Sequence, residues 1–303
     1  KYPQFRPYGL LSADFKKQIF NKVKALVTYK IGNVVSNSVD NIVISAALGL
    51  VVLAKYGNYY YVITTLFTLL QIYYNAITAG IGNSVVVGSV EDNYKNFKTM
   101  LLMQSFICGF CSACLLSLYQ DFITLWMGGD MLFDLSVVIC LVAYFYCWKI
   151  QDVVNIYKDA LGMWEKDRWR PLISAAVNLC LNIVSVRFIG LYGIIGSTIF
   201  CSLFIDMPWG ATVLFKDYFK KENGGYFLKI ALFSVFNAAA CALCFFICGY
   251  IPQSESKLYS VLVFIGKGAI CFAAYTILFV AVFFRTAEFK NVAGKMKNLV
   301  RKK

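Results

Sequence analysis

Four oxygen-bearing side chains, carried by three hydrophobic stretches of the sequence, could together hold a hard cation. Asn178 and Asn182 stand four residues apart, so both lie on one face of a helix. Asp40 and Thr198 belong to two other stretches, and packing would have to bring them to this pair. One carboxylate, two amide oxygens and one hydroxyl form an all-oxygen ligand set of the kind that hard cations prefer. We therefore expect a cation site at Asp40, Asn178, Asn182 and Thr198; the alternative is hydrogen bonding between helices alone.

Polar side chains also follow helical spacing within the first two hydrophobic stretches, where a polar group exposed to lipid is costly. In the second stretch they recur at intervals of four, three, four and three residues, in a single stripe: Thr64, Thr68, Gln71, Asn75 and Thr78. In the first stretch, Asn33, Asn37 and Asp40 share a face. Two consecutive stripes predict the wall of a hydrated cavity, although the threonines alone favour bonds between helices. The residues expected to line this cavity are Asn33, Asn37, Gln71, Tyr74, Asn75, Thr78, Lys149 and Asp152.

Charged residues within the later stretches need partners or a route to water. Lys149 and Asp152 stand three residues apart and can pair, which lowers the cost of burying both. The spacing leaves open whether this pair is structural or lines the cavity. Asp206 precedes Pro208, which predicts a kink in the helix. Lys267 lies near an expected membrane boundary, where its ammonium group can reach the interface.

The residue types exclude several kinds of chemistry. The 303 residues include no histidine, which removes histidine zinc sites and the Ser-His-Asp and Cys-His nucleophile systems. Cys108, Cys111 and Cys114 have the spacing of iron–sulfur ligands, but they lie in an apolar helix, where small residues serve close packing. We expect no cluster, disulfide, metal or cofactor, apart from possible coupling to Na⁺ or H⁺, and no enzymatic activity.

The elements that position these residues are membrane-spanning helices. The chain is 59% hydrophobic and only 15% charged, with a mean hydropathy of +0.64, and windows of about 20 apolar residues identify spanning helices. Eight spans are expected, near residues 28–53, 57–88, 99–119, 132–159, 170–189, 193–215, 226–250 and 259–284. The sequence therefore predicts an all-α, polytopic membrane helix bundle.

The distribution of positive charge orients this bundle. With the N-terminus in the cytoplasm, 24 of the 29 lysines and arginines fall in inside segments and three fall outside. Both termini are then cytoplasmic, and the net charge of +13 forms a rim that attracts membrane lipids rather than nucleic acid. Apolar residues spaced about a helical turn apart among lysines predict amphipathic helices on the inner leaflet at both ends: Leu11, Phe15, Ile19 and Val23, and Phe289, Val292, Met296 and Leu299.

Four segments resemble the C-terminal half of Wzx-type polysaccharide flippases, which belong to the multidrug/oligosaccharidyl-lipid/polysaccharide exporter superfamily. They are NSVDNIVISAALGLVVLAKYGNYY at 37–60, FITLWMGGD at 122–130, WEKDRWRPLISAAVNLCLNIV at 164–184 and GLYGIIGSTIFCSLFIDMPW at 190–209. Their order covers nearly the whole chain. The resemblance implies an inter-lobe linker at 1–27, a six-helix C-terminal lobe at 28–216, two additional spans at 217–285 and a basic cytoplasmic tail at 286–303. The chain implied by this resemblance would be half of a two-lobe flippase, without its N-terminal lobe.

The resemblance also implies an activity and a departure from the family pattern. The activity would be movement of undecaprenyl-pyrophosphate-linked oligosaccharides across the bacterial cytoplasmic membrane by alternating access, beside polysaccharide polymerases and glycosyltransferases. Relatives that carry a cation site have Asp, Asn-x3-Asp and Thr where this chain has Asp40, Asn178 and Thr198. Asn182 replaces the second Asp, so sodium binding would weaken and Asp40 could carry a proton instead.

Two other functions remain open at this point. One is a drug/cation antiporter of the same superfamily. The other is a membrane-embedded glycosyltransferase, acyltransferase or O-antigen ligase, against which stand the absence of histidine and the short outside loops.

Overall fold

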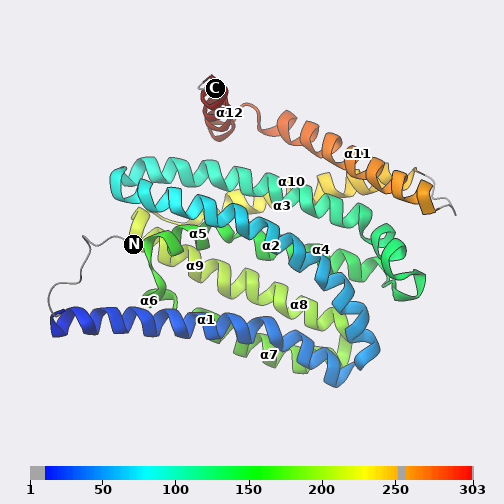
Figure 1. Cartoon of the computed structure of the whole chain (residues 1–303), viewed down its shortest axis with the longest axis horizontal. Coiled ribbons are helices and arrows are strands. Elements are labelled where there is room, and N and C mark those ends of the chain that lie inside the picture. The colour runs from blue at the N-terminus through cyan, green and yellow to red at the C-terminus, as the bar shows by residue number, and fades with distance from the viewer. Residues whose placement is uncertain (1–10, 252–256, 302–303) are drawn as a thin grey trace, which may run out of the picture.

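The computed structural model describes residues 11–251 and 257–301, and these residues form helices and no strands. The helices run alternately up and down a bundle, with α12 lying across one end (Figure 1). Their bounds are α1 Ala13–Ala47, α2 Leu50–Val87, α3 Val90–Met127, η1 Gly129–Met131, α4 Leu135–Ile150, α5 Asp152–Leu161, α6 Trp164–Asp167, α7 Arg170–Ile189, α8 Leu191–Cys201, η2 Ser202–Asp206, α9 Met207–Leu214, η3 Phe215–Phe219, α10 Gly224–Gly249, α11 Lys257–Phe283 and α12 Ala287–Arg301.

Seven helical segments of the described chain are long and apolar enough to cross a membrane: 50–87, 90–127, 135–161, 164–189, 191–219, 224–249 and 258–283. The fold is therefore the expected all-α polytopic bundle of a multi-pass membrane protein. The first of the eight expected spans does not meet this criterion. It belongs to α1, whose asparagine, serine and aspartate residues between 33 and 41 lower its hydropathy.

The N-terminal boundaries differ from those expected. The amphipathic segment and the first span form one continuous helix, because no proline interrupts residues 13–47. The turn to α2 falls at Leu48 and Gly49 instead of near residue 55, and Lys55 lies within α2. Gly49 has a φ of 87°, a left-handed value that glycine adopts without strain, whereas Gly57 continues the helix.

Two spans are interrupted near their middle, and the interruptions face each other. The fourth span breaks at Gln151, between α4 and α5, and the sixth contains the π-helical turn η2 just before Pro208. Gln151 Nε2 donates to Ser202 Oγ at 2.8 Å, which joins the two interruptions. Where a kink was expected from Pro208, the structure has a π turn, which accommodates the missing proline N–H.

Helix α3 lies in the middle of the bundle and contacts α4 on one side and α10 and α11 on the other. Gly109 permits the close approach of α10 and α11 to α3. A Cβ at this position would stand 2.0 Å from Tyr275 Oη and 2.2 Å from Asn237 Oδ1. Gly32 does the same for α1 against α7, where a Cβ would meet Pro171 Cβ at 2.8 Å. These contacts fix α1 and α7, which carry the expected cation ligands, against each other.

The basic loops gather at one end of the bundle. The α2–α3 turn, α6, the segment before α10 and the start of α12 all lie at the end where α1 begins, on the left in Figure 1. Two of the lysines and arginines counted there are not free rim charges, because Lys158 and Arg170 are buried in ion pairs. Lys267 likewise does not reach the interface: it is buried and its ammonium lies 2.7 Å from Asp121 Oδ2 on α3.

Candidate functional site

The four expected cation ligands meet in one place between α1, α7 and α8. Asp40 Oδ1 accepts a hydrogen bond from Asn182 Nδ2 at 2.7 Å, and Asp40 Oδ2 accepts one from Thr198 Oγ1 at 2.9 Å. Asn178 bridges the other two, since it donates to Thr198 Oγ1 at 3.0 Å and accepts from Asn182 at 3.2 Å. Packing therefore brings together residues up to 158 positions apart in the sequence.

The amide of Asn178 is better satisfied with its oxygen and nitrogen exchanged. Rotation of the Asn178 amide lets its oxygen accept from Thr198 Oγ1 at 3.0 Å and Thr198 N at 3.3 Å, while its nitrogen donates to Asp40 Oδ1 at 3.3 Å. Asn182 is fully buried, and its Oδ1 has no hydrogen-bond partner. A buried amide oxygen without a donor is costly, and a proton or a cation beside Asp40 would give it a partner.

Beside Asp40 lies a small recess with aromatic walls. Tyr56 and Tyr60 from α2 stack with ring centroids 5.5 Å apart, and Tyr60 Oη lies 3.5 Å from Tyr144 Oη on α4. Trp148 and Asn41 complete the lining. Asp40 as a whole residue is half-buried, while Asn178, Asn182 and Thr198 are buried. The recess thus lies beside the least buried of the four side chains.

The polar residues of the α2 stripe fall into two groups that differ in their hydrogen-bond partners. Thr64, Thr68 and Thr78 donate to carbonyls of their own helix at 2.8–3.0 Å. Because their hydroxyl donors are already used, these threonines do not require a hydrated cavity. Gln71 and Asn75 are exposed and bond only to each other, with Gln71 Nε2 donating to Asn75 Oδ1 at 2.9 Å.

The other expected cavity residues of α1 and α2 are placed as follows. Asn33 is half-buried against the neighbouring helices, and the side chain of Asn37 lies outside the described residues. Tyr74 is buried, and its hydroxyl accepts from Gln104 Nε2 at 2.6 Å. Tyr74 therefore belongs to the interior of the bundle and not to its exposed stripe.

Lys149 and Asp152 form the expected pair at the break between α4 and α5. Lys149 Nζ donates to Asp152 Oδ2 at 2.8 Å, and both side chains are nearly inaccessible to solvent. The ammonium lies 4.3 Å from the ring centroid of Phe67 and 5.6 Å from that of Tyr74, both on α2. In this conformation the positive charge is therefore covered by α2 and neutralised locally.

A second charged network, which the sequence did not indicate, holds the basic end of the bundle together. Arg170 donates to Asp167 Oδ1 at 2.9 Å and to Asp206 Oδ1 at 2.9 Å, and its third contact is Tyr29 Oη at 3.1 Å. Lys158 pairs with the same Asp167 at 2.5 Å. The two positive and two negative charges are buried and balance each other. They join α5, α6, α7 and η2, and the hydroxyl of Tyr29 links α1 to them.

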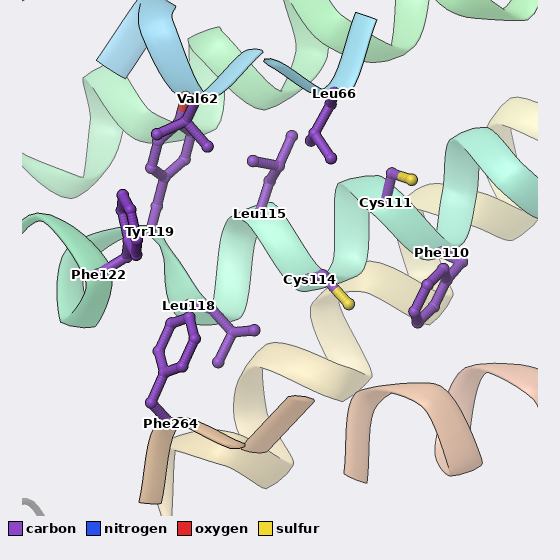
Figure 2. A pocket seen from close by; sticks show the side chains of 10 residues that line it. All are labelled: Val62, Leu66, Phe110, Cys111, Cys114, Leu115, Leu118, Tyr119, Phe122 and Phe264. Carbon is purple, nitrogen blue, oxygen red and sulfur yellow. The ribbon is translucent and has the colours of Figure 1, made fainter. Parts of the chain in front are cut away.

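An apolar pocket of about 300 Å³ lies between α2, α3 and α11. Figure 2 shows Leu66 and Val62 above it, Phe264 below it, and the thiols of Cys111 and Cys114 on the α3 helix between them. Its lining consists of hydrocarbon, aromatic rings and sulfur, with almost no polar surface. The pocket can therefore hold an apolar chain or a small uncharged molecule and offers nothing to a charged one.

Comparison of the chain with protein-family models, with curated proteins and with solved structures gave no significant match. Among the described residues, no three His, Cys, Asp or Glu side chains are grouped so that they could hold a metal ion.

Sequence reasoning missed several residues of the site. Tyr56, Tyr144 and Trp148 enclose Asp40, but on the sequence they look like any aromatic residues near a membrane interface. The signal that could have found Tyr56 is the position of the α1–α2 turn. With the turn placed at Gly49, Tyr56 lies on the second helical turn of α2, level with the Asp40 end of α1.

Proposed function

We propose that this chain is a lobe of a transporter that moves lipid-linked oligosaccharides, undecaprenyl-pyrophosphate-linked repeat units, across the bacterial cytoplasmic membrane. The observation that carries the proposal is the Asp40 carboxylate, held by Asn182 and Thr198 at the bottom of a recess between membrane helices. A carboxylate at membrane depth is costly unless it binds an ion or a proton, and such groups mark ion and proton pathways.

The outward face of α2 supports a water-filled path beside this site. An amide pair cannot face lipid without loss of hydrogen bonds, so Gln71 and Asn75 require water or a second bundle opposite them. We propose that a second helical lobe, in the same chain or another, packs against α1 and α2 and encloses a cavity with them. The sugar and pyrophosphate would pass through this cavity, with both termini of this chain on the cytoplasmic side.

The proposed cavity also needs a place for the lipid chain and a positive charge for the pyrophosphate. The apolar pocket in Figure 2 borders α2, and its lining suits a hydrocarbon chain. Lys149 lies behind α2, where an outward movement of Phe67 and Tyr74 would expose its ammonium. Transport by alternating access involves such relative movements of helices.

Asp40 would couple transport to a monovalent cation or to a proton. Asp40, Asn178, Asn182 and Thr198 supply one carboxylate, two amide oxygens and one hydroxyl, and the unpartnered Asn182 Oδ1 fits this role. A bound cation would compensate the Asp40 charge, and a proton on Asp40 could be donated to Asn182 Oδ1. In the structure the Asn182 amide nitrogen donates to Asp40. A proton on Asp40 would reverse this hydrogen bond, whereas a cation would replace it with coordination by the two oxygens.

The test is export of a surface polysaccharide by the chain together with its second lobe, in bacteria that lack their own flippase. Asp40→Asn should reduce export at least tenfold at an unchanged protein level, because the variant cannot bear a negative charge. Asp130→Asn, at an exposed position of η1, is the matched control and should export normally. Normal export by Asp40→Asn would show that Asp40 is only a packing residue and would remove the basis of the proposal.

A further inference from the structure

A groove with a volume of about 520 Å³ lies between α4 and α10, both of which pack on α3. This volume is typical of pockets that bind small ligands. The residues that line the groove follow helical spacing from Ile139 to Ile150 on α4 and from Ile230 to Ala242 on α10. At a rise of 1.5 Å per residue, its α10 side is about 18 Å long. The groove therefore matches an extended chain better than a compact molecule.

The groove opens on the outer surface of the bundle. Ile139 on α4 is 50% exposed, and Ala238 and Ala242 on α10 are also exposed. Because both helices belong to segments that can cross a membrane, this opening faces lipid hydrocarbon and not water. The described lining includes no residue of α1 or α2, so the groove is separate from the proposed transport path. A ligand can thus enter it sideways from the bilayer.

Two hydroxyl groups that line the groove lack an acceptor for their protons among the described residues. Ser112 on α3 is 2% exposed, and its Oγ has no hydrogen-bond partner. Tyr146 Oη on α4 accepts from Asn237 Nδ2 at 3.1 Å and from Ser234 Oγ at 3.2 Å, but its own proton is not used in either contact. A buried donor without an acceptor is costly, so the groove is complementary to a ligand with an acceptor oxygen.

The lining of the groove selects an uncharged ligand. None of the described residues that line it carries a charge. Asn237 stands near the middle of α10, so Tyr146, which it contacts, lies at about the middle of the membrane. A phosphate or carboxylate at this depth would lose its hydration without gaining a positive partner, at a much greater cost than a carbonyl. Phospholipid esters are kept near the membrane surface by their charged head groups and do not reach this depth.

We propose that the groove between α4 and α10 binds an uncharged long-chain lipid that carries a carbonyl oxygen. The chain lies along the two helices, and the carbonyl oxygen accepts from the free hydroxyl groups of Tyr146 and Ser112. A carbonyl suits this role better than an alcohol, because it has two lone pairs and adds no further donor that would need a partner. Two classes of lipid have this chemistry, uncharged acyl esters and isoprenoid quinones.

The experiment uses the full chain in bilayer nanodiscs and a methyl palmitate probe with a diazirine in its chain. On illumination, the probe should label peptides within 139–150 and 230–242. An excess of unlabelled methyl palmitate or of menaquinone should remove this label, and the stronger competitor of the two identifies the lipid class. Heptadecane, which has no oxygen, and hexadecyl phosphate, which is charged, should each compete about fivefold less well.

Three variants separate recognition of the chain from recognition of the carbonyl. Ala238→Phe fills the groove at its exposed rim and should reduce labelling at least tenfold. Ala239→Phe, at the exposed neighbouring position outside the groove, is the matched control and should be labelled normally. The double variant Ser112→Ala, Tyr146→Phe removes both free donors. It should be labelled about fivefold less by the ester probe and equally well by a diazirine-bearing alkane.

Each of four outcomes would overturn the proposal. Heptadecane could compete as well as methyl palmitate, the label could persist in Ala238→Phe, or the double variant could be labelled like the wild type by the ester probe. The label could also be confined to the pocket of Figure 2 between α2, α3 and α11. Should Ala238→Phe fail to fold, peptide mapping and competition with the wild-type chain still decide.

Discussion

Under the proposed function, Asn182 is the residue that sets the coupling chemistry of Asp40. The pair now shares one negative charge, with the Asn182 amide nitrogen directed at the carboxylate at 2.7 Å. The other amide atom, Oδ1, has no partner. In the proposed cation site, the side chain that limits affinity is therefore Asn182, because it contributes a donor where a cation requires an acceptor.

Asn182→Asp should strengthen the dependence of export on a cation. The second carboxylate adds a negative charge to a buried position, which favours a bound cation and disfavours an empty site. Export by this variant, measured over a range of sodium concentrations at constant ionic strength, should rise with sodium more steeply than export by the wild type. An unchanged sodium response would assign coupling to another part of the transporter. Asn21→Asp, at an exposed position of α1, controls for the added charge.

At the scale of elements, the ion pairs of Arg170 join several helices at the basic end of the bundle. Arg170→Met should lower the free energy of unfolding by about 3–5 kcal/mol, because it leaves Asp167 and Asp206 buried with too few positive partners. The measurement is thermal or denaturant unfolding in detergent. Arg168→Met is the matched control, since Arg168 is only half-buried and lies over the Trp169 ring. Equal stability of the two variants would contradict the structural role of Arg170.

Helix α12 is attached to the bundle in a pH-dependent manner. Burial alone would raise the pKa of Glu288, but the hydrogen bond and charge of Lys229 on α10 outweigh it and lower that pKa below its usual value. A lowered pKa in the folded state means that the ion pair stabilises the attachment above the pKa of a free glutamate. This stabilisation is lost as the pH falls through the folded-state value.

Hydrogen exchange of α12, measured between pH 7 and pH 3.5 and corrected for the intrinsic rate, should therefore accelerate toward the acidic end. Glu288→Gln should remove this step and exchange faster already at pH 7. Glu222→Gln, at an exposed position, should leave the profile unchanged. A pH profile of the Glu288→Gln variant identical to that of the wild type would show that the apolar contacts of Phe289 and Val292, both on α12, hold the helix alone.

The elements divide clearly into those that the sequence predicts and those that it does not. Asn178 and Asn182 were predictable as neighbours, because four-residue spacing is local, and their meeting with Asp40 follows from three helices packing at one depth. Lys158 and Arg170 were misread as rim charges, because the counting of loop charges ignores pairing with distant aspartates such as Asp206. The break at Gln151 could not be predicted, because no proline or glycine marks it; Gln151 bonds there to Ser202, a residue 51 positions away.

For the whole molecule, the gathering of the basic loops at one end predicts a definite orientation. A single cysteine at Asn223, on a background without native cysteines, should not be labelled by a membrane-impermeant maleimide applied to intact cells. A cysteine at Gly129, at the opposite end, should be labelled. The lysines and arginines near Asn223 favour the cytoplasmic side. Labelling with the reverse pattern would invert the topology and place the recess beside Asp40 at the other membrane face.

The π turn η2 has a consequence for the angular phase of the sixth span. In a regular α-helix, Thr198 and Asp206 would point about 80° apart around the axis, because eight residues advance about two turns and a quarter. The extra residue of a π turn cancels one step of about 100°, which reduces the difference to about 20°. Both side chains can therefore face α7, where Thr198 bonds to Asn178 and Asp206 bonds to Ser174 at 2.9 Å. One added residue thus lets a single helix serve the carboxylate site and the arginine network from the same side.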